Sequence, residues 1–285
     1  MRRYAAVLGS PVSDSLSPTL HQAAYRALGL TDWSYRAIEM TEADLPEWLD
    51  QLGPEWAGLS LTRPLKRIAV TLADQIGPLA AATGAANTLL LGSTGRSALN
   101  TDVHGIVAAV QEAAPGANFG KAVVLGGGAT AASALAALSE LGAAAIQLWV
   151  RSISRSQAAT AAATGMGLKL QIHRFAAPYE ILPACRQANL LISALPPGAA
   201  DHLATALEMV AARPSGQVLP DGAVLLDVAY QPWPSALARA WSKAGGVVVS
   251  GRTMLLHQAA RQVCLMTGRE APLEAMRAAL ARQAE

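Results

Sequence analysis

The stretch Ala122-Val123-Val124-Leu125-Gly126-Gly127-Gly128-Ala129-Thr130-Ala131 decides the fold of the second half of the chain. Its first four residues form a continuous apolar run, which predicts a buried β-strand. The glycines follow at once, and an Ala- and Leu-rich pattern then predicts a helix to about Leu141. A GxGxxA sequence between a strand and a helix allows close backbone approach, and the helix N-terminus presents N–H donors to a pyrophosphate. We therefore expect a dinucleotide-binding domain rather than a simple glycine-rich turn.

The next strand indicates which dinucleotide is bound. It is expected over Ala145–Val150 and ends at Arg151-Ser152-Ile153-Ser154-Arg155. Domains that prefer NAD carry an acidic residue here for the ribose 2′-hydroxyl, whereas a 2′-phosphate requires cations and hydroxyls. Arg151, Ser152 and Arg155 supply these groups, and each charge-assisted hydrogen bond contributes about 1.5–3 kcal/mol. The alternative is a basic strand end on a solvated loop; we predict NADP(H).

Short apolar strands alternate with Ala-rich helical patterns along nearly the whole chain, which is typical of an α/β fold with largely parallel sheets. No glycine-rich phosphate loop occurs in the first half, and Pro115-Gly116-Ala117-Asn118 indicates a domain boundary. In that half we expect strands at 5–8, 34–38 and 86–91, and helices at 18–28, 42–52 and from 102 to about 114.

Lys66 is one of four lysines and closes the run Thr62-Arg63-Pro64-Leu65-Lys66. Pro64 and the apolar pattern after it predict a helix start, with Lys66 in the first turn. The unpaired N–H groups of a first turn disfavour a cation by about 0.3–1 kcal/mol, so the ammonium proton would be held less tightly. Such a lysine suits proton transfer or polarisation of a substrate oxygen. The alternative is a solvated lysine on a basic helix end.

Several other polar residues have ordinary structural explanations when taken singly. Ser17, before Pro18, is a good helix N-cap, whereas Ser15 lies outside the cap and is free to donate to a ligand. Asp102 is explained as a helix cap and Asn87 as a turn residue. Each residue therefore becomes a candidate only in combination with others.

Composition excludes several classes of protein. The 285 residues suffice for two domains, and no apolar run approaches the roughly 18 residues of a membrane span. The apolar stretch at the start of the chain is too short for a secretory signal, so we expect a cytoplasmic protein without a membrane partner. A net charge of +2, no long basic run and few aromatics argue against a nucleic-acid partner. A small anionic ligand remains compatible.

The cysteines and histidines carry no recognisable site. Cys185 and Cys264 are far apart and lack any CxxC grouping, so we expect free thiols. The five histidines show no ligand spacing, and we predict no metal. No heptad pattern decides the oligomeric state, which we leave as monomer or homodimer.

Seven motifs, taken together, resemble shikimate dehydrogenase in their order and spacing. The resemblance covers essentially the whole chain, and seven ordered motifs are far more specific than any one. They are Gly9-Ser10-Pro11-Val12 leading to Ser15-Leu16-Ser17-Pro18, Ser60-Leu61-Thr62-Arg63-Pro64-Leu65-Lys66, Ala86-Asn87-Thr88, Asn100-Thr101-Asp102-Val103-His104-Gly105, the glycine loop, Arg151-Ser152, and Gly251-Arg252-Thr253-Met254-Leu255-Leu256-His257-Gln258.

The resemblance implies two domains and one activity. A substrate domain with a mixed, mainly parallel sheet would comprise residues 1–102 and 256–285, and a Rossmann NADP-binding domain residues 103–255. The implied activity is reversible hydride transfer between NADPH and 3-dehydroshikimate, which gives shikimate in chorismate and aromatic amino acid biosynthesis. The implied partner is therefore this small-molecule substrate.

The resemblance also implies roles for individual residues. Lys66 and Asp102 match the catalytic pair. Substrate positions are the carboxylate-binding Ser15 and Ser17, the contact residue Thr62, the ring-hydroxyl ligands Asn87 and Gln258, and Tyr230 near the substrate. Cofactor positions are Gly126, Gly127, Gly128, Ala129, Thr130, Ala131, Arg151, Ser152, Arg155, Gly251 and Met254.

Departures from the family pattern bear on substrate range. Ser60 and Val150 each stand where the family commonly has Asn, and the segment 192–195 replaces a more polar strand end. A paralogue acting on quinate or amino-shikimate is therefore the alternative enzyme. The alternative from another class is a non-catalytic NADP-binding regulator, which would be expected to lose Lys66 or Asp102; both are present.

Overall fold

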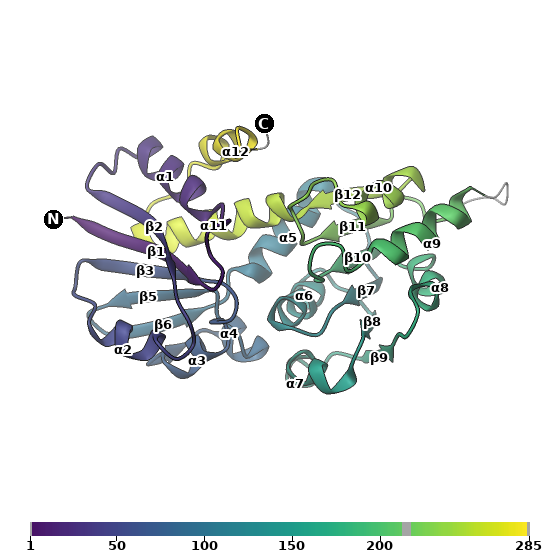
Figure 1. The fold of residues 1–285 in the computed structure, drawn as a ribbon, viewed down its shortest axis with the longest axis horizontal. Helices are drawn as coiled ribbons and strands as arrows, with labels where there is room; N and C mark the ends of the chain where they lie inside the picture. The colour runs from purple at the N-terminus through teal and green to yellow at the C-terminus, as the bar shows by residue number, and fades with distance from the viewer. Residues whose placement is uncertain (1, 213–217, 284–285) are drawn as a thin grey trace. The chain divides into compact units, whose positions relative to one another are not determined.

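The computed structural model describes residues 2–212 and 218–283 and divides the chain into two compact units (Figure 1). Unit 1 comprises Met1–Gly105 and Leu255–Glu285, and unit 2 comprises Ile106–Met254. Strands and helices alternate in both units, so the predicted α/β class is confirmed.

Unit 1 is built on a six-stranded sheet with the order β2-β1-β3-β5-β6-β4. β1 pairs in parallel with β2 and β3, and β4 with β6, whereas β5 runs antiparallel to β3 and β6. The sheet is therefore mixed and mainly parallel, as expected. Its strands are β1 (Arg3–Gly9), β2 (Trp33–Glu39), β3 (Trp56–Leu61), β4 (Gln75–Ile76), β5 (Thr88–Gly92) and β6 (Gly95–Leu99).

The two faces of this sheet are covered by different helices because side chains alternate along a strand. Ala5 and Val7 of β1 pack in a core with α1, α11 and α12, whereas Ala6 and Leu8 pack in a second core with α2 and α3. The helices are α1 (Ser17–Ala27), α2 (Leu45–Asp50), α3 (Ile68–Thr71), α4 (Pro78–Thr83), α11 (Gly251–Thr267), whose residues from Leu255 onward lie in unit 1, and α12 (Leu273–Ala281).

β3 is a central strand that the sequence patterns do not predict. All six of its residues are buried, but Gly58 and Ser60 interrupt the apolar run. A Cβ atom at Gly58 would lie 2.9 Å from the carbonyl oxygen of Leu89 on β5. Glycine therefore permits the close approach of β3 and β5, and this close approach holds the start of β5 beside the turn that follows β3.

Unit 2 contains a six-stranded parallel sheet with the order β12-β11-β10-β7-β8-β9. The order reverses between β7 and β10, which is where open parallel sheets bind ligands at their carboxyl edge. The expected strand and helix on either side of the glycine loop are confirmed as β7 and α6. The strands are β7 (Lys121–Leu125), β8 (Ala145–Val150), β9 (Leu170–Arg174), β10 (Leu190–Ser193), β11 (Val224–Asp227) and β12 (Val247–Ser250).

Helices cover this sheet, and a core of β7, β10 and β11 residues packs against α9 and α10. α5 begins at Asp102 and continues past Ile106 into unit 2, so Pro115-Gly116-Ala117-Asn118 follows a helix that already belongs largely to this unit. The helices are α5 (Asp102–Ala113), α6 (Ala129–Glu140), α7 (Gln157–Gly165), α8 (Leu182–Cys185), α9 (Asp201–Ala211) and α10 (Ala236–Lys243), with short 3₁₀ turns η1 (Ile153–Ser156) and η2 (Pro178–Ile181).

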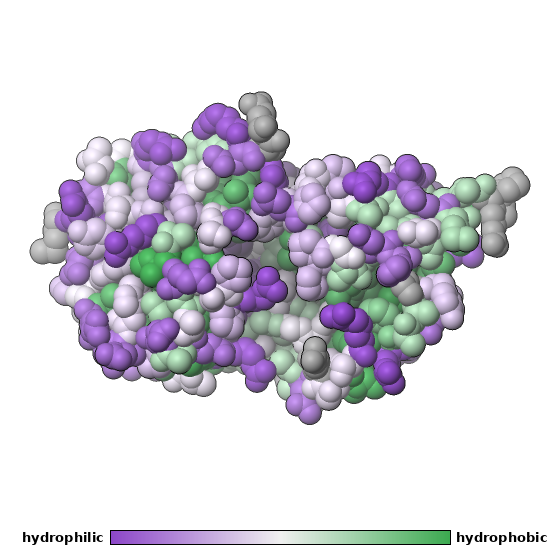
Figure 2. All heavy atoms as spheres, in the orientation of Figure 1, coloured by the Kyte–Doolittle hydropathy of each residue, from purple (hydrophilic) through white to green (hydrophobic). Residues whose placement is uncertain are grey.

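The surface mixes polar and apolar side chains. On the face drawn in Figure 2, apolar patches are separated by strongly polar residues. The large apolar residues exposed in the described part of the chain lie on separate elements: Ile76, Ile153, Tyr179 and Met209. Within residues 2–212 and 218–283, no helix is long and apolar enough to cross a membrane.

Candidate active site

Four of the predicted site residues form one hydrogen-bonded cluster in unit 1. Lys66 Nζ donates to Asp102 Oδ2 at 2.5 Å. Asn87 Nδ2 donates to Asp102 Oδ1 at 2.8 Å and to Gln258 Oε1 at 3.0 Å. The four side chains come from the turn before α3, the residue before β5, the start of α5, and α11. A cation, a carboxylate and two amides are thus held together, although 192 positions (258 − 66) separate the first from the last.

Lys66 does not lie in the first turn of a helix, so that prediction is wrong. Residues 63–67 form a turn, and α3 starts only at Ile68 and has four residues. The turn is held by the buried Leu65 and by the Lys66 carbonyl, which accepts from the Ala86 N–H at 2.7 Å. The ammonium group is therefore governed by its contact with Asp102, and the helix-terminus argument does not apply to it.

Asp102 and Asn87 are fixed by their own neighbours. Asp102 is the first residue of α5, where a carboxylate is favoured by the unpaired N–H groups of the helix start. Its N–H donates to Asn100 Oδ1 at 3.0 Å. The Thr101 N–H donates to Asn87 Oδ1 at 2.7 Å, which turns the Nδ2 end of Asn87 toward Asp102.

The ion pair is largely shielded from water. The side chains of Lys66 and Asp102 are 15% and 7% exposed. A shielded pair of opposite charges is costly to break by removing one partner, because the remaining charge is left without compensation. The Lys66 side chain keeps some contact with solvent while Asp102 holds its ammonium in place.

The two serines lie together at the start of α1, but Ser17 is not the N-cap expected from the sequence. α1 begins at Ser17 itself, with Leu16 in the cap position. Ser17 has helical backbone and is buried, whereas Ser15 Oγ accepts from the Ser17 N–H at 3.3 Å. The hydroxyl of Ser15 therefore accepts from one of the unpaired N–H groups at the helix start, which is the role expected of Ser17.

Thr62 follows β3 and packs tightly on the end of β1. A Cβ atom at Gly9 would lie only 2.3 Å from Thr62 Cγ2, so the methyl group occupies space that only glycine leaves free. The Thr62 N–H donates to the Leu8 carbonyl at 2.9 Å, and its own carbonyl accepts from Leu65 N–H at 2.8 Å. These contacts place Thr62 at the start of the turn that carries Lys66.

A buried polar chain, absent from the sequence predictions, underlies this cluster. Tyr35 donates to Ser60 Oγ at 2.6 Å, and Ser60 donates to Gln262 Oε1 at 2.8 Å. Gln262 Nε2 in turn donates to the Asn87 carbonyl at 3.0 Å. Gln262 lies four residues after Gln258 on α11, so the two share one helix face, and this spacing was the available sequence signal.

Two aromatic residues close the inner end of this chain. His21 stacks on Tyr35 with ring centroids 3.9 Å apart and is fully buried. Burial lowers the pKa of His21 to about 3, only partly offset by its hydrogen bond with Gln262. Burial also raises the pKa of Tyr35, against the opposing effect of hydrogen bonds with Ser60 and Ser17. Both rings are therefore neutral near pH 7, and Tyr35 connects Ser17 to Ser60.

The glycine loop of unit 2 has the geometry of an anion-binding turn. Gly126 has φ +112°, and a Cβ atom there would lie 3.0 Å from the Ala194 carbonyl oxygen. Gly128 is the N-cap of α6 and, as a glycine, has no side chain to cap this helix start. Among the described residues, apart from its chain neighbours, no heavy atom lies within 4 Å of a Cβ position at Gly128, so this side of the loop is open. These features fit a dinucleotide pyrophosphate.

The other expected cofactor residues follow neighbouring parallel strands. Arg151 and Ser152 come after β8, and Ser152 Oγ lies 2.8 Å from Ser154 Oγ. Arg155 lies in η1, and its side chain is outside the described part of the structure. Gly251 begins α11 after β12, where a Cβ atom would lie 2.1 Å from the Val228 carbonyl oxygen. Carboxyl ends of parallel strands share one sheet edge, so these positions lie along the same edge as the glycine loop.

Met254 and Tyr230 complete the predicted residues in unit 2. Met254 is buried on α11, and Tyr230 lies in the segment after β11. That segment is anchored by Asp227, whose Oδ2 accepts from Ser235 Oγ at 2.6 Å and whose Oδ1 accepts from the Ala229 N–H at 3.3 Å. Burial raises the pKa of Asp227, against the hydrogen bonds it accepts.

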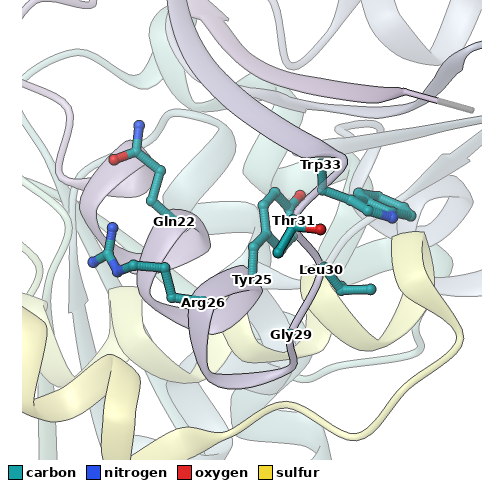
Figure 3. Close-up of a pocket in the computed structure, with 7 residues that line it drawn as sticks. All are labelled: Gln22, Tyr25, Arg26, Gly29, Leu30, Thr31 and Trp33. Atoms are coloured by element: carbon teal, nitrogen blue, oxygen red, sulfur yellow. The ribbon is translucent and has the colours of Figure 1, made fainter.

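Other features of the described residues lie apart from these sites. A pocket of about 330 Å³ lies at the end of α1 and the following loop (Figure 3). It contains none of the predicted site residues; its lining is Gln22, Tyr25, Arg26, Gly29, Leu30, Thr31 and Trp33. Among residues 2–212 and 218–283, no group of three or more His, Cys, Asp or Glu could hold a metal ion. Cys185 and Cys264 are free.

Two family models match parts of the sequence. The model described as "Shikimate dehydrogenase substrate binding domain" matches residues 7–89, which run from the end of β1 to the start of β5. The model described as "Shikimate 5'-dehydrogenase C-terminal domain" matches residues 251–281, which carry α11 and α12. The two matched segments include Lys66, Asn87 and Gln258.

Similar proteins extend the match to the whole chain. The shikimate dehydrogenase (NADP(+)) of Methanothermobacter thermautotrophicus is 32% identical over 282 residues, covering 97% of this chain and 95% of that protein. The crystal structure of Mycobacterium tuberculosis shikimate dehydrogenase is 41% identical, covers 99% of both chains and has a TM-score of 0.84. A Thermus thermophilus shikimate 5-dehydrogenase in complex with NADP(H) and shikimate is 31% identical, covers 98% of this chain and 99% of that one, and has a TM-score of 0.79.

Proposed function

The chain belongs to the shikimate dehydrogenase family, and we propose that it catalyses the reversible NADPH-dependent reduction of 3-dehydroshikimate to shikimate. This reaction belongs to the biosynthesis of chorismate and the aromatic amino acids. The observation that carries the proposal is the shielded Lys66–Asp102 ion pair, held by Asn87 at 2.8 Å from Asp102. A regulator without catalytic activity would have no need of this pair.

The chemistry of the pair suits reduction of a ketone. Hydride arriving at the carbonyl carbon leaves negative charge on the oxygen, and a cation beside that oxygen stabilises the transition state. Lys66 is the cation, and its Nζ is fixed by Asp102 at 2.5 Å. The pair supplies the proton that converts the oxygen to a hydroxyl, and it accepts that proton in the reverse direction.

We assign most of the remaining substrate contacts to residues of unit 1. We assign the carboxylate to Ser15 and Ser17 at the start of α1, with Thr62 as a further contact. The amides of Asn87 and Gln258, 3.0 Å apart, are placed to bind ring hydroxyls beside the ion pair. Tyr230, in the segment after β11, is assigned to the substrate through the family resemblance.

The cofactor residues follow from the glycine loop. Residues Gly126 to Ala131 would hold the pyrophosphate of NADP at the uncapped N-terminus of α6. Arg151 and Ser152 would bind the 2′-phosphate together with Arg155, and Gly251 and Met254 lie at the start of α11. When bound, NADPH supplies the hydride.

We also propose a cellular location, a class of partner and an oligomeric state. A biosynthetic enzyme of small, charged metabolites fits the cytoplasm, with no nucleic-acid partner and with a monomeric or homodimeric state. Cell fractionation tests the location, and light scattering of the purified chain tests the oligomeric state.

The catalytic role is tested by Lys66→Met, which keeps the length of the side chain and removes the ammonium. We expect kcat for shikimate oxidation to fall by about 10²- to 10⁴-fold while the KM for NADP⁺ is unchanged. Lys243→Met is the matched control, because Lys243 forms an exposed ion pair with Glu208 at 2.9 Å. If both variants keep kcat within twofold of the unmodified chain, Lys66 has no part in the reaction.

A further inference from the structure

Gln262 is a buried amide of α11 that is not among the predicted site residues. It is 1% exposed. Its Nε2 donates to the Asn87 carbonyl at 3.0 Å and to Thr88 Oγ1 at 2.9 Å. Its Oε1 accepts from Ser60 Oγ at 2.8 Å and faces His21 Nε2 at 3.3 Å. Two donated and two accepted bonds use the full capacity of an amide side chain.

These contacts fix which end of the amide faces the ion-pair cluster. Tyr35 donates to Ser60 at 2.6 Å, so the single hydroxyl hydrogen of Ser60 is available for Gln262 Oε1. His21 is neutral, and an amide oxygen only accepts, so His21 Nε2 carries its hydrogen on the Gln262 side. Gln262 Oε1 therefore faces Ser60 and His21, and its two N–H groups face Asn87 and Thr88.

Thr88 links the orientation of the Gln262 amide to that of the Asn87 amide. Because Thr88 Oγ1 accepts from Gln262, its own hydrogen is free to donate to Asn87 Oδ1 at 3.0 Å. The Thr101 N–H donates to the same oxygen at 2.7 Å. The Thr101 hydroxyl lies 3.2 Å from Asn87 Oδ1 as well. With its oxygen held by Thr88 and Thr101, Asn87 directs Nδ2 at Asp102 Oδ1, 2.8 Å away.

We propose that Gln262 is a positioning residue for the reaction, which acts through Thr88 and the Asn87 main chain to keep the Asn87 amide on Asp102 and so hold the Lys66–Asp102 pair. The proposal rests on the proposed function and adds a residue that touches neither substrate nor cofactor in it. Because Thr101 holds the same oxygen of Asn87, loss of Gln262 loosens the cluster without dispersing it.

Two variants test the chain of contacts from opposite ends. Gln262→Met removes the amide at similar length, and Thr88→Val removes the relaying hydroxyl at similar shape. We expect each to lower kcat for shikimate oxidation by roughly tenfold with little change in the KM for NADP⁺, as for a small misplacement of catalytic groups. The double variant should lose clearly less than the sum of the two single losses, because both substitutions break the Gln262–Thr88 contact.

The control is Val263→Ala, one residue along α11. Val263 is fully buried in the apolar core of α1, β1 and α12, so its truncation lowers stability without touching a polar group. We expect its kcat to stay within twofold of the unmodified chain. If Gln262→Met, at equal or smaller loss of Tm, also keeps kcat within twofold, or if the two single losses simply add in the double variant, the positioning role is wrong.

A second readout does not depend on turnover. The chain has four asparagines, so selective ¹⁵N-asparagine labelling gives a simple set of side-chain amide signals. We expect the Asn87 signal to shift in Thr88→Val and to stay in place in Val263→Ala. Absence of shikimate turnover in the unmodified chain would overturn the proposed function alone; an unmoved Asn87 signal in folded Thr88→Val would overturn the positioning role. If Gln262→Met does not fold, Thr88→Val decides both readouts.

Discussion

His21 makes the stability of unit 1 depend on pH in a direction that can be measured. Its ring is fully buried between α1 and β2, stacked on Tyr35 at 3.9 Å. Burial lowers its pKa from 6.5 to about 3. A base whose pKa is lowered by folding contributes stability that is present above the unfolded value and is lost as pH falls toward the folded value. The loss therefore begins near pH 6.5 and continues toward pH 3.

The size of the effect follows from these two values. Between pH 7 and pH 5 the unfolded chain takes up most of one proton at this site, whereas the folded chain takes up almost none. With pKa values of 6.5 and about 3, linkage gives a loss of about 2 kcal/mol in the free energy of unfolding over this interval. His21→Gln keeps an N–H donor for Gln262 and removes the titration.

The assay is urea unfolding of the unmodified chain and His21→Gln at pH 7 and pH 5, with hydrogen exchange of α1 and β2 amides to assign the change to unit 1. We expect the unmodified chain to lose about 2 kcal/mol more than the variant between the two pH values. His202→Gln, on the exposed surface of α9, is the control and should behave as the unmodified chain. Equal losses in the unmodified chain and His21→Gln would refute the reasoning.

Two further predictions concern the cofactor loop and its specificity. Gly126→Ala should cost about 1–3 kcal/mol of stability, since φ is +112° and the new Cβ would lie 3.0 Å from the Ala194 carbonyl. Gly128→Ala should cost less than about 1 kcal/mol, since its φ of −87° suits any residue and the loss is only that of glycine at a helix N-cap, yet it should weaken NADP⁺ binding measured by calorimetry; equal stability losses in the two variants would contradict this distinction. Arg151→Ala should reduce the preference for NADPH over NADH by roughly 10- to 100-fold in Kd, the equivalent of one charge-assisted hydrogen bond. Arg186→Ala, on an exposed residue after α8, is its control, and a preference unchanged by Arg151→Ala would remove Arg151 from the 2′-phosphate site.

The dinucleotide unit could be predicted from the sequence because its signals are local. β7 is a continuous apolar run, and Gly126 and Gly128 stand directly before an Ala-rich helix, so strand, loop and helix are each encoded within a few residues. β8 was predicted with its observed bounds for the same reason. Fully buried strands of parallel sheets show such uninterrupted apolar patterns.

Unit 1 could be predicted less well because its key contacts are long-range. β3 was missed, since Gly58 is required by the close approach of β5 and Ser60 by a bond to Tyr35, and both break the apolar pattern. Lys66 was singled out for a helix-terminus effect that the turn at 63–67 removes. Its actual partner is Asp102, 36 residues away, and no local pattern encodes such a pair.

The role of Gln262 also could not be predicted from the sequence. Its spacing from Gln258 places the two glutamines on one face of α11, but the sequence does not show which groups Gln262 contacts. Its hydrogen-bond partners include Asn87, 175 residues away, and Ser60, 202 residues away. Only the sheet and α11 together bring these groups within hydrogen-bond distance, so the buried polar chain could not be inferred from spacing alone.

The most direct test of the central claim is the initial rate of cofactor reduction by the purified chain, with shikimate or quinate as substrate and NADP⁺ or NAD⁺ as acceptor. The reaction is followed by the absorbance of the reduced nicotinamide. We predict rapid turnover with shikimate and NADP⁺ and much slower turnover in the other three combinations. Turnover of quinate at a comparable rate would contradict the assigned substrate, and no turnover despite measurable NADP⁺ binding would contradict the enzymatic function itself.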